Sequence, residues 1–375
     1  MRTVDAAGLP IGDGHPPRIM GVLNVSEESP YSPSVFDDPA EAADYVDTEL
    51  IDEGADIVDV GLESANKRFE VLTAEQELDR LDTAIETIER VEGDAVFSIE
   101  TRYHEVADAA LSRGFDMVND ICGFADPEMP EVCAAHDAAV VKMASPPDLE
   151  RPGAVEEVDD IYDALSMNGF TEKTIVDPAF GGWSEAKTTD HDRETLRRLR
   201  EFRGLERPIL VSINRKNFLR EVAGRDTEEA LPVSLAATSM AVERGAHIVR
   251  THDVAETRDA ALIGHEFARE RLRDPDVTEL DVTTPAEFAR HLEAAGRDPS
   301  LAPRGVARAL KITGLGATEA ETLADAAADA GAAFVSGDPS YLAGDADSLR
   351  SLAAAIADEN GRLGRLSRRV RRVAS

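Results

Sequence analysis

Short apolar runs alternate with amphipathic helical stretches eight times between residues 18 and 270. Nearly every position within a run is apolar, which is typical of a strand buried on both faces in a parallel sheet. Eight such units in about 250 residues predict a TIM (β/α)8 barrel in the α/β class, with a doubly wound open sheet as the alternative. The runs cover residues 19–25, 57–61, 96–100, 117–120, 139–143, 174–177, 209–212 and 247–253.

Amphipathic periodicity predicts the helices that connect these runs. One of them opens at Thr73, because Gln76 stands three residues later in the spacing of a capping box. The other predicted helices cover approximately residues 39–54, 104–113, 127–136, 155–167, 192–203, 228–244 and 254–270.

The pattern changes around residues 273–278, and the chain beyond is rich in alanine and aspartate. We therefore predict two domains, a barrel over residues 1–275 and a small C-terminal α/β appendage over 276–375. Within the appendage, from residue 280 on, we expect a first strand, then helices at 285–295, 318–330 and 346–357 and strands at 309–314 and 332–336 between them. The tail 361–375 carries six arginines and is expected to pack on the protein's own surface.

The formal net charge is −34, from 74 acidic and 40 basic residues, which disfavours nucleic acid and anionic membranes as partners. Only six residues are lysine, and such an acidic surface suits a salt-rich cytoplasm, where the Debye length is roughly 3 Å at 1 M. No signal pattern and no apolar run of ~20 residues is present, which predicts a soluble cytoplasmic protein. The two cysteines, Cys122 and Cys133, are too few for a disulfide scaffold or a zinc site of their own.

Functional side chains recur at the carboxyl ends of the predicted strands. In a parallel barrel these ends meet at the ligand-binding face, so we expect the side chains to converge on one site. A single polar residue there is usually a turn former, but repetition on seven of eight strands is hard to explain in that way. The residues are Asn24, Glu63, Glu100, Asn119, Met143, Asp177, Arg215, Lys216, Arg250 and His252.

One part of this set suits a flat, nitrogen-rich ring. Glu100, Asn119 and Asp177 offer carboxylate and amide groups for paired N–H groups of a heterocycle. Lys216 can donate to a ring carbonyl or place its charge over the ring face. A heteroaromatic substrate is therefore predicted.

Another part suits an anion. Arg250 and His252, with Asn24 across the barrel, can bind a phosphate or pyrophosphate, and the Asn24 oxygen can ligate Mg²⁺. No nucleophile-plus-base pair stands out, so covalent catalysis by the protein is not indicated. The absence of a Walker loop and of a GxGxxG motif argues against a nucleotide kinase or a dehydrogenase.

Over about residues 18–268 the chain resembles dihydropteroate synthase, with the family's signatures in the right order and spacing. The matching segments are Ile19-Met-Gly-Val-Leu-Asn-Val-Ser26, Gly54-Ala-Asp-Ile-Val-Asp-Val-Gly61 with Glu63-Ser64, Ser98-Ile-Glu-Thr101, Asn119-Asp120, Asp177-Pro178, Arg215-Lys216 and Arg250-Thr-His-Asp-Val254.

The resemblance implies a TIM barrel that joins p-aminobenzoate to the pyrophosphate ester of a hydroxymethyl-dihydropterin and releases pyrophosphate, with Mg²⁺ as cofactor. It implies that the pterin is held by Glu100, Asn119, Asp177 and Lys216, and that Arg250, His252 and Asn24 hold pyrophosphate and Mg²⁺. Lys216, Arg250 and His252 are then the candidate catalytic residues, and Glu63, Met143 and Arg215 complete the candidate substrate-binding set. The resemblance also allows a homodimer.

Several loops depart from the family pattern. The second loop, normally Glu-Ser-Thr-Arg-Pro-Gly, runs Glu63-Ser-Ala-Asn-Lys-Arg68, where Lys67 or Arg68 are candidate substitutes for the missing arginine. Glu100 stands where the family has Asp. The pterin pocket is thus largely kept while the acceptor-side loops are rewritten. A methyltetrahydrofolate-dependent corrinoid methyltransferase barrel and a non-catalytic pterin-binding protein are the alternative hypotheses.

Overall fold

The computed structural model describes residues 2–25, 34–63, 71–149, 155–181, 186–274, 277–359 and 361–374. The chain forms two compact units, Met1–Glu270 and Arg271–Ser375. The sequence placed the boundary five residues later, after 275. The difference arises because the short hairpin of β11 (Arg273–Asp274) and β12 (Val277–Thr278) belongs to the second unit.

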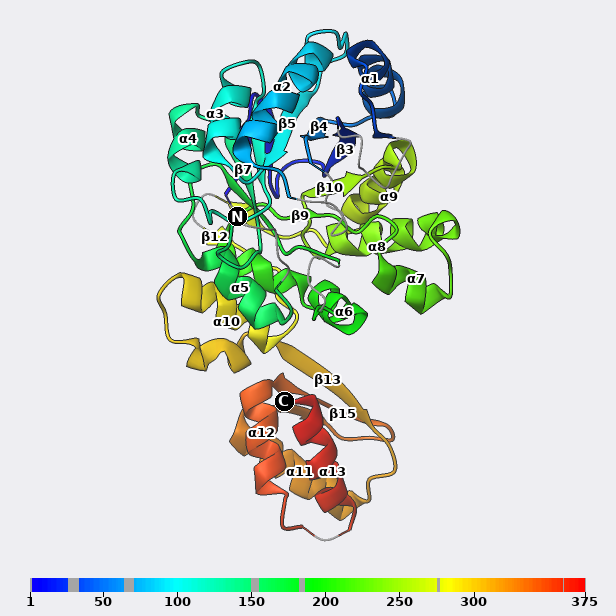
Figure 1. Cartoon of the computed structure of the whole chain (residues 1–375). Coiled ribbons are helices and arrows are strands. Elements are labelled where there is room, and N and C mark those ends of the chain that lie inside the picture. The colour runs from blue at the N-terminus through cyan, green and yellow to red at the C-terminus, as the bar shows by residue number, and fades with distance from the viewer. Residues whose placement is uncertain are drawn as a thin grey trace. The chain divides into compact units, whose positions relative to one another are not determined.

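The first unit is a TIM barrel, as predicted (Figure 1). Its strands are β3 (Arg18–Asn24), β4 (Ile57–Gly61), β5 (Val96–Thr101), β6 (Met117–Asp120), β7 (Ala139–Met143), β8 (Thr174–Asp177), β9 (Leu210–Val211) and β10 (Ile248–Thr251). All neighbours pair in parallel, in the order β8-β7-β6-β5-β4-β3-β10-β9. A parallel bridge between Val176 and Ile209 joins β8 to β9, and the Val176 amide donates to Pro208 O at 2.9 Å, which closes the ring.

Helices surround the strands at nearly all the predicted places. They are α1 (Pro39–Tyr45) with the π-helical η2 (Val46–Ile51), α2 (Ala74–Ile88), α3 (His104–Leu111), α4 (Met129–Ala135), α5 (Val158–Ser166), α6 (Thr189–Arg197) with the 3-10 helix η3 (Leu199–Leu205), α8 (Leu231–Glu243) and α9 (Val254–Glu266). The capping box at Thr73 is confirmed, since its hydroxyl accepts from the Gln76 amide at 3.3 Å and the Gln76 side chain accepts from the Thr73 amide at 2.9 Å. The short α7 (Asn217–Ala223) was not predicted, whereas the 3-10 turn η4 (Glu228–Ala230) forms the start of the helix predicted over 228–244.

The amino-terminal end of the barrel is filled by apolar side chains. Met20, Ile57 and Met117, from the beginnings of three strands, lie in one buried cluster with Val4 and Ile11. The last two belong to an antiparallel hairpin of β1 (Val4–Ala6) and β2 (Leu9–Ile11), which the sequence pattern did not predict. The hairpin therefore plugs this end of the barrel and leaves the carboxyl end for a ligand.

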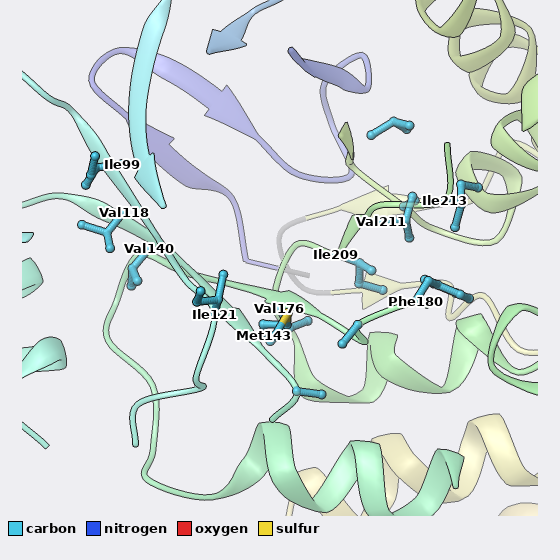
Figure 2. Packing of buried hydrophobic residues seen from close by; sticks show 14 of the residues in the cluster. Ile99, Val118, Ile121, Val140, Met143, Val176, Phe180, Ile209, Val211 and Ile213 are labelled. Atoms are coloured by element: carbon cyan, nitrogen blue, oxygen red, sulfur yellow. The ribbon is translucent and has the colours of Figure 1, made fainter. Parts of the chain in front are cut away.

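A second apolar layer lies between the strands and the helices. Figure 2 shows Ile99, Val118 and Val140 side by side on β5, β6 and β7, where strand register pairs Ile99 with Val118 and Val118 with Val140. All three are fully buried in the cluster that the surrounding helices complete. Burial on both faces of the strands explains why their sequences are apolar almost throughout. No helix in the described part of the chain is both long enough and apolar enough to cross a bilayer.

The second unit contains a three-stranded antiparallel sheet in the order β13-β15-β14. Its elements are α10 (Pro285–Ala294), η5 (Pro299–Arg304), β13 (Ala307–Ile312), α11 (Ala317–Ala330), β14 (Ala333–Val335), β15 (Ser340–Asp345), α12 (Ala346–Ala355) and α13 (Arg362–Val373). The sequence missed β15 and did not identify the basic tail as a helix. As expected, however, the tail packs on its own unit, because α13 buries Leu363, Ser367 and Val370 against neighbours that include α12.

Candidate active site

Strand alternation determines which side chains enter the barrel above the apolar floor. Because successive residues point to opposite faces, Asp59 and Gly61 share the face of Ile57, and Arg250 shares the face of Ile248. The predicted tip residues of β3, β5, β6, β7 and β8 stand at the same carboxyl end, at two levels of register. Glu100 is in register with Asn119 and, through Gly61, with Asn24, whereas Met143 pairs with Asp177 two residues beyond the level of Asn119. The site is therefore lined by the last inward-facing residue or two of each strand.

Arg250 is the centre of a hydrogen-bonded network that joins four strands. Its Nε donates to Asp59 Oδ2 at 2.7 Å, and its Nη2 donates to Glu100 Oε2 at 2.7 Å. Asp59 also accepts from Asn119 Nδ2 at 2.9 Å and from Ser98 Oγ at 2.8 Å. Asp59 is fully buried, so its charge is balanced inside the barrel by Arg250 rather than by water.

Sequence reasoning missed Asp59 because it considered only the strand tips. A signal was present, since an aspartate in the middle of the apolar run Ile57-Val-Asp-Val-Gly61 is costly unless it is paired.

Glu100 and Asp177 are carboxyl groups with raised pKa values. Burial raises the pKa of Glu100 to about 7 despite the opposing charge of Arg250. Burial also raises the pKa of Asp177 to about 6, although its Oδ1 accepts from the Ala179 amide at 2.8 Å. Both groups thus change protonation close to neutral pH, and a ligand that donates N–H bonds would favour their ionised forms.

The ammonium group of Lys216 is available to a ligand. Lys216 immediately precedes α7, and burial, followed by the charge of Arg250, lowers its pKa. Its side chain lies against Gly181, where an added Cβ would be 2.9 Å from Nζ. Within the described ranges Nζ has no hydrogen-bond partner. A desolvated cation in this state is a ready donor for a ligand carbonyl.

His252 and Asn24 lie together through Ser34, as the predicted anion site requires. Asn24 Nδ2 donates to Ser34 Oγ at 3.1 Å, and Ser34 Oγ lies 3.4 Å from His252 Nδ1. Burial, then the charge of Arg250, lowers the pKa of His252 to about 3, so its imidazole is neutral at physiological pH. The positive charge at this side of the site therefore comes from Arg250 and not from His252.

Asn24 offers an oxygen to a hard cation. Because its amide nitrogen is directed to Ser34, Oδ1 points over Gly61, where an added Cβ would lie 3.1 Å from Asn24 Oδ1 and 3.9 Å from Glu100 Oε1. Glycine at this position thus leaves a small space lined by two oxygens. Oxygen ligands of this kind suit Mg²⁺.

Arg215, predicted to bind substrate, is held by protein groups. Its Nε and Nη2 donate to the two oxygens of Asp253 at 2.8 and 2.7 Å, and its Nη1 donates to the carbonyls of Thr227 and Glu228, both at 2.9 Å. These bonds tie the loop after β9 to the loop after β10. The structure therefore gives Arg215 a positioning role next to Lys216.

The two remaining predicted residues are Glu63, in the loop after β4, and Met143, at the end of β7. Glu63 accepts from Arg102 Nη1 at 2.6 Å and from the Leu72 amide at 2.9 Å, so its carboxylate joins the two ends of the second loop. Met143 is 5% exposed at the end of β7, in register with Asp177. It can contribute an apolar contact to a ring.

Parts of three loops at the carboxyl ends of the strands lie outside the described residues, namely 26–33, 64–70 in the altered second loop, and 182–185. Lys67 and Arg68, the predicted substitutes for the family's arginine, fall within the second of these ranges.

Comparison with known proteins places the barrel among pterin enzymes. The family model "Pterin binding enzyme" matches residues 20–252. A probable bifunctional folylpolyglutamate synthase/dihydropteroate synthase of Haloferax volcanii is 34% identical over 276 residues, which are 70% of this chain and 31% of that protein. The dihydropteroate synthase of Bacillus subtilis is 31% identical over 244 residues, 64% of this chain and 84% of that enzyme. The chain thus spans about a third of the haloarchaeal relative and most of the bacterial one.

The fold agrees with solved structures. The dihydropteroate synthase of Coxiella burnetii in complex with pteroic acid superposes with a TM-score of 0.59 at 28% identity, covering 70% of this chain and 98% of that one.

Proposed function

The chain belongs to the pterin-binding enzyme family, and on that premise we propose that it is a dihydropteroate synthase-type transferase. The proposed reaction joins (7,8-dihydropterin-6-yl)methyl diphosphate to p-aminobenzoate or a related arylamine and releases pyrophosphate, in folate or pterin biosynthesis. The observation that carries the proposal is the Lys216 ammonium, desolvated beside Asp177 and Arg250 without a hydrogen-bond partner among the described residues. A ring carbonyl would supply that missing acceptor.

The pterin ring is assigned to the inner part of the site. The Asp177 carboxylate and the Asn119 amide oxygen can accept the N–H groups of the aminopyrimidine edge. Glu100, which accepts from Arg250, is a third candidate acceptor. Lys216, whose ammonium interacts with Asp177, can donate to the ring oxygen. Met143 contributes apolar contact to the ring face.

The diphosphate is assigned to the side of Asn24 and His252. Neutral His252 can donate one hydrogen bond to a phosphate oxygen, and Arg250 supplies the nearby positive charge. Mg²⁺ bound through Asn24 Oδ1 would neutralise charge on the departing pyrophosphate. The residues thereby stabilise the charge separation that develops as the C–O bond to the diphosphate breaks, before the arylamine nitrogen attacks the methylene carbon.

The proposed diphosphate site favours the synthase reaction over the alternative of a methyl-transfer barrel. A methyl-transfer barrel handles no pyrophosphate, so it has no use for the Asn24–Ser34–His252 arrangement beside Arg250. All the proposed substrate contacts lie in the first unit, so we treat the second unit as accessory to this reaction. Soluble charged substrates and the acidic surface favour a cytoplasmic location.

We further propose that the barrel forms a homodimer through α8 and α9. Met240 on α8, Ile263 on α9 and Phe267 just beyond it are 46%, 54% and 78% exposed. The two helices pack closely, because a Cβ at Gly264 would lie 2.5 Å from Ser239 O, so they present one firm surface. Light scattering on Ile263→Asp/Phe267→Asp should give a monomer where the parent gives a dimer; a monomeric parent would refute the proposal.

The first experiment is pyrophosphate release from the pterin diphosphate, with p-aminobenzoate and Mg²⁺ at molar KCl. Arylamine-dependent release is expected, and a reaction without arylamine provides the control. Tight pterin binding without release would instead support a non-catalytic protein or a different acceptor. Absence of pterin binding would refute the proposal altogether.

A further inference from the structure

The second unit contains a groove that has no part in the proposed reaction. It lies between the edge strand β13 and the basic helix α13 and has a volume of about 410 Å³. Leu310 and Ile312 from the strand, with Leu366 and Val370 from the helix, form its apolar side. A volume in this range matches sites for small organic ligands, which run from about 300 to 1,000 Å³.

Cationic side chains line the rest of the groove. The helix α13 carries six arginines and no acidic residue, and the spacing of Arg362, Arg365 and Arg369 places all three toward the strand. Lys311 lines the groove from β13 and is one of only six lysines in the chain. Three arginines thus share one face of the helix beside the apolar side of the groove, and Lys311 lines the groove from the edge strand.

Three of these four cations lack a counter-charge. Arg362 is anchored, since its Nη1 donates to Thr313 O at 3.0 Å and its Nε lies 4.0 Å from a Glu319 oxygen. Lys311, Arg365 and Arg369 make neither a hydrogen bond nor an ion pair with any residue that the structure describes. Mutual repulsion of the unpaired cations is a cost that a bound anion would remove.

The unpaired cations stand out against the composition of the chain. With 74 acidic and 40 basic residues, carboxylates outnumber cations almost two to one, and some arginines of this unit pair with them. Arg350, for example, donates to Asp347 at 2.9 Å, and Arg304 donates to the same carboxylate at 3.2 Å. Arg297, Arg368 and Arg371 also have no side-chain hydrogen bond or ion pair with a described residue, but they do not line this groove. The convergence of Lys311, Arg365 and Arg369 on one groove is therefore what indicates a ligand.

We propose that this groove binds an organic oligophosphate, of the class of nucleoside di- and triphosphates. Each phosphate carries up to about two negative charges and several acceptor oxygens, which match the forked donors of Arg365 and Arg369 better than a single carboxylate would. The apolar side accommodates the rest of the ligand. A long nucleic acid is disfavoured, because the net charge of −34 repels an extended polyanion beyond the groove.

The test is calorimetric titration of the full-length protein with ATP, tripolyphosphate and adenosine at 0.2 M and 2 M KCl. We expect ATP and tripolyphosphate to bind and adenosine to bind far more weakly. Arg365→Gln/Arg369→Gln should lower the affinity for ATP at least tenfold, because two charge-assisted contacts are lost. Arg368→Gln/Arg371→Gln is the matched control, since it removes the same charge from exposed positions outside the groove and should change affinity less than about twofold.

Three results would overturn the proposal: no binding of either phosphate probe to the parent protein, equal losses in both double variants, or binding that increases with the length of single-stranded RNA while ATP is inert. Circular dichroism must show that both variants remain folded. The groove variant should release pyrophosphate from the pterin substrate at the parent rate, so failure of this proposal is distinguishable from failure of the barrel's proposed reaction.

Discussion

Arg250 and Asp59 form an ion pair, 2.7 Å between Nε and Oδ2, that joins β10 to β4 through the interior of the barrel. The aspartate is fully buried and the arginine is 19% exposed, so water screens the pair little. Such a pair holds the guanidinium in one orientation, with its Nη2 directed to Glu100. Asp59 therefore positions the cation that faces the proposed diphosphate.

Asp59→Asn should destabilise the protein by about 3 kcal/mol, because it leaves the buried guanidinium with one carboxylate instead of two. Urea unfolding at fixed KCl measures this change. Asp56→Asn is the control: Asp56 pairs with Arg18 at 3.2 Å, but both side chains are partly exposed, and a loss of about 1 kcal/mol or less is expected. Equal losses in the two variants would show that the buried Arg250–Asp59 pair contributes no more to stability than the partly exposed pair.

Lys216→Ala should weaken pterin binding by more than roughly tenfold, since a hydrogen bond to a charged group contributes ~1.5–3 kcal/mol. Lys173→Ala removes the same charge just before β8, at the opposite end of the barrel, where Lys173 pairs with Asp137 at 2.9 Å. That control should bind normally. Fluorescence titration with a pterin compares the two, and an unchanged affinity in Lys216→Ala would remove Lys216 from the site.

Gly181→Ala should lower pterin affinity by displacing Lys216, because the new Cβ would lie 2.9 Å from Nζ. Its backbone φ of +106° adds strain of its own. Gly169→Ala controls for strain, since φ is +71° there and nothing lies within 4 Å of the added Cβ. Both variants should lose stability, but only Gly181→Ala should lose binding; matched affinities would refute the contact.

Asp177→Asn should impair pterin recognition, whereas Asp56→Asn at the amino-terminal end should not. The pKa of Asp177 is about 6, so parent affinity should fall as pH drops below 6 and the carboxylate acceptor is protonated. In Asp177→Asn that dependence should be reduced. Binding measured from pH 5 to 8 tests both expectations, and equal effects of the two substitutions would contradict the assignment of the carboxyl face.

Glu77→Gln should reduce the pH dependence of stability. Burial raises the pKa of Glu77 from 4.5 to about 7, so its contribution is most favourable below pH 4.5 and is lost as pH rises through 7. The variant has no proton to lose but can still accept from Thr101 Oγ1, which donates to Glu77 at 2.6 Å. The parent should lose on the order of 2 kcal/mol more than the variant between pH 4.5 and 8. Parallel urea-unfolding profiles would contradict this.

The barrel could be predicted because burial on both faces makes its strands apolar almost throughout, and this pattern can be recognised in each short stretch of sequence by itself. Elements without such a pattern were missed. The hairpin of β1 and β2 is two three-residue strands, and its role appears only when Val4 and Ile11 meet the barrel interior. The helix α7 directly follows Lys216 and is only seven residues long, too short for clear periodicity.

The site was predictable to the extent that strand ends define it. Which tip residues combine was not, because partners such as Arg250 and Asp59 are separated by 191 positions in the sequence. The role of Arg215 was not predictable for the same reason. Its sequence position suggests a substrate ligand, but the structure pairs it with Asp253, 38 positions away.

The barrel interior is apolar at one end and charged at the other, and this separation bears on how such a protein can change over generations. The buried apolar cluster at the plugged end stabilises the barrel independently of the loops at its opposite end. Substitutions in those loops can accumulate without threatening the fold, while the side chains proposed to bind the ring stay fixed on rigid strands. A lineage with this architecture can exchange one acceptor molecule for another and still recognise the same heterocycle.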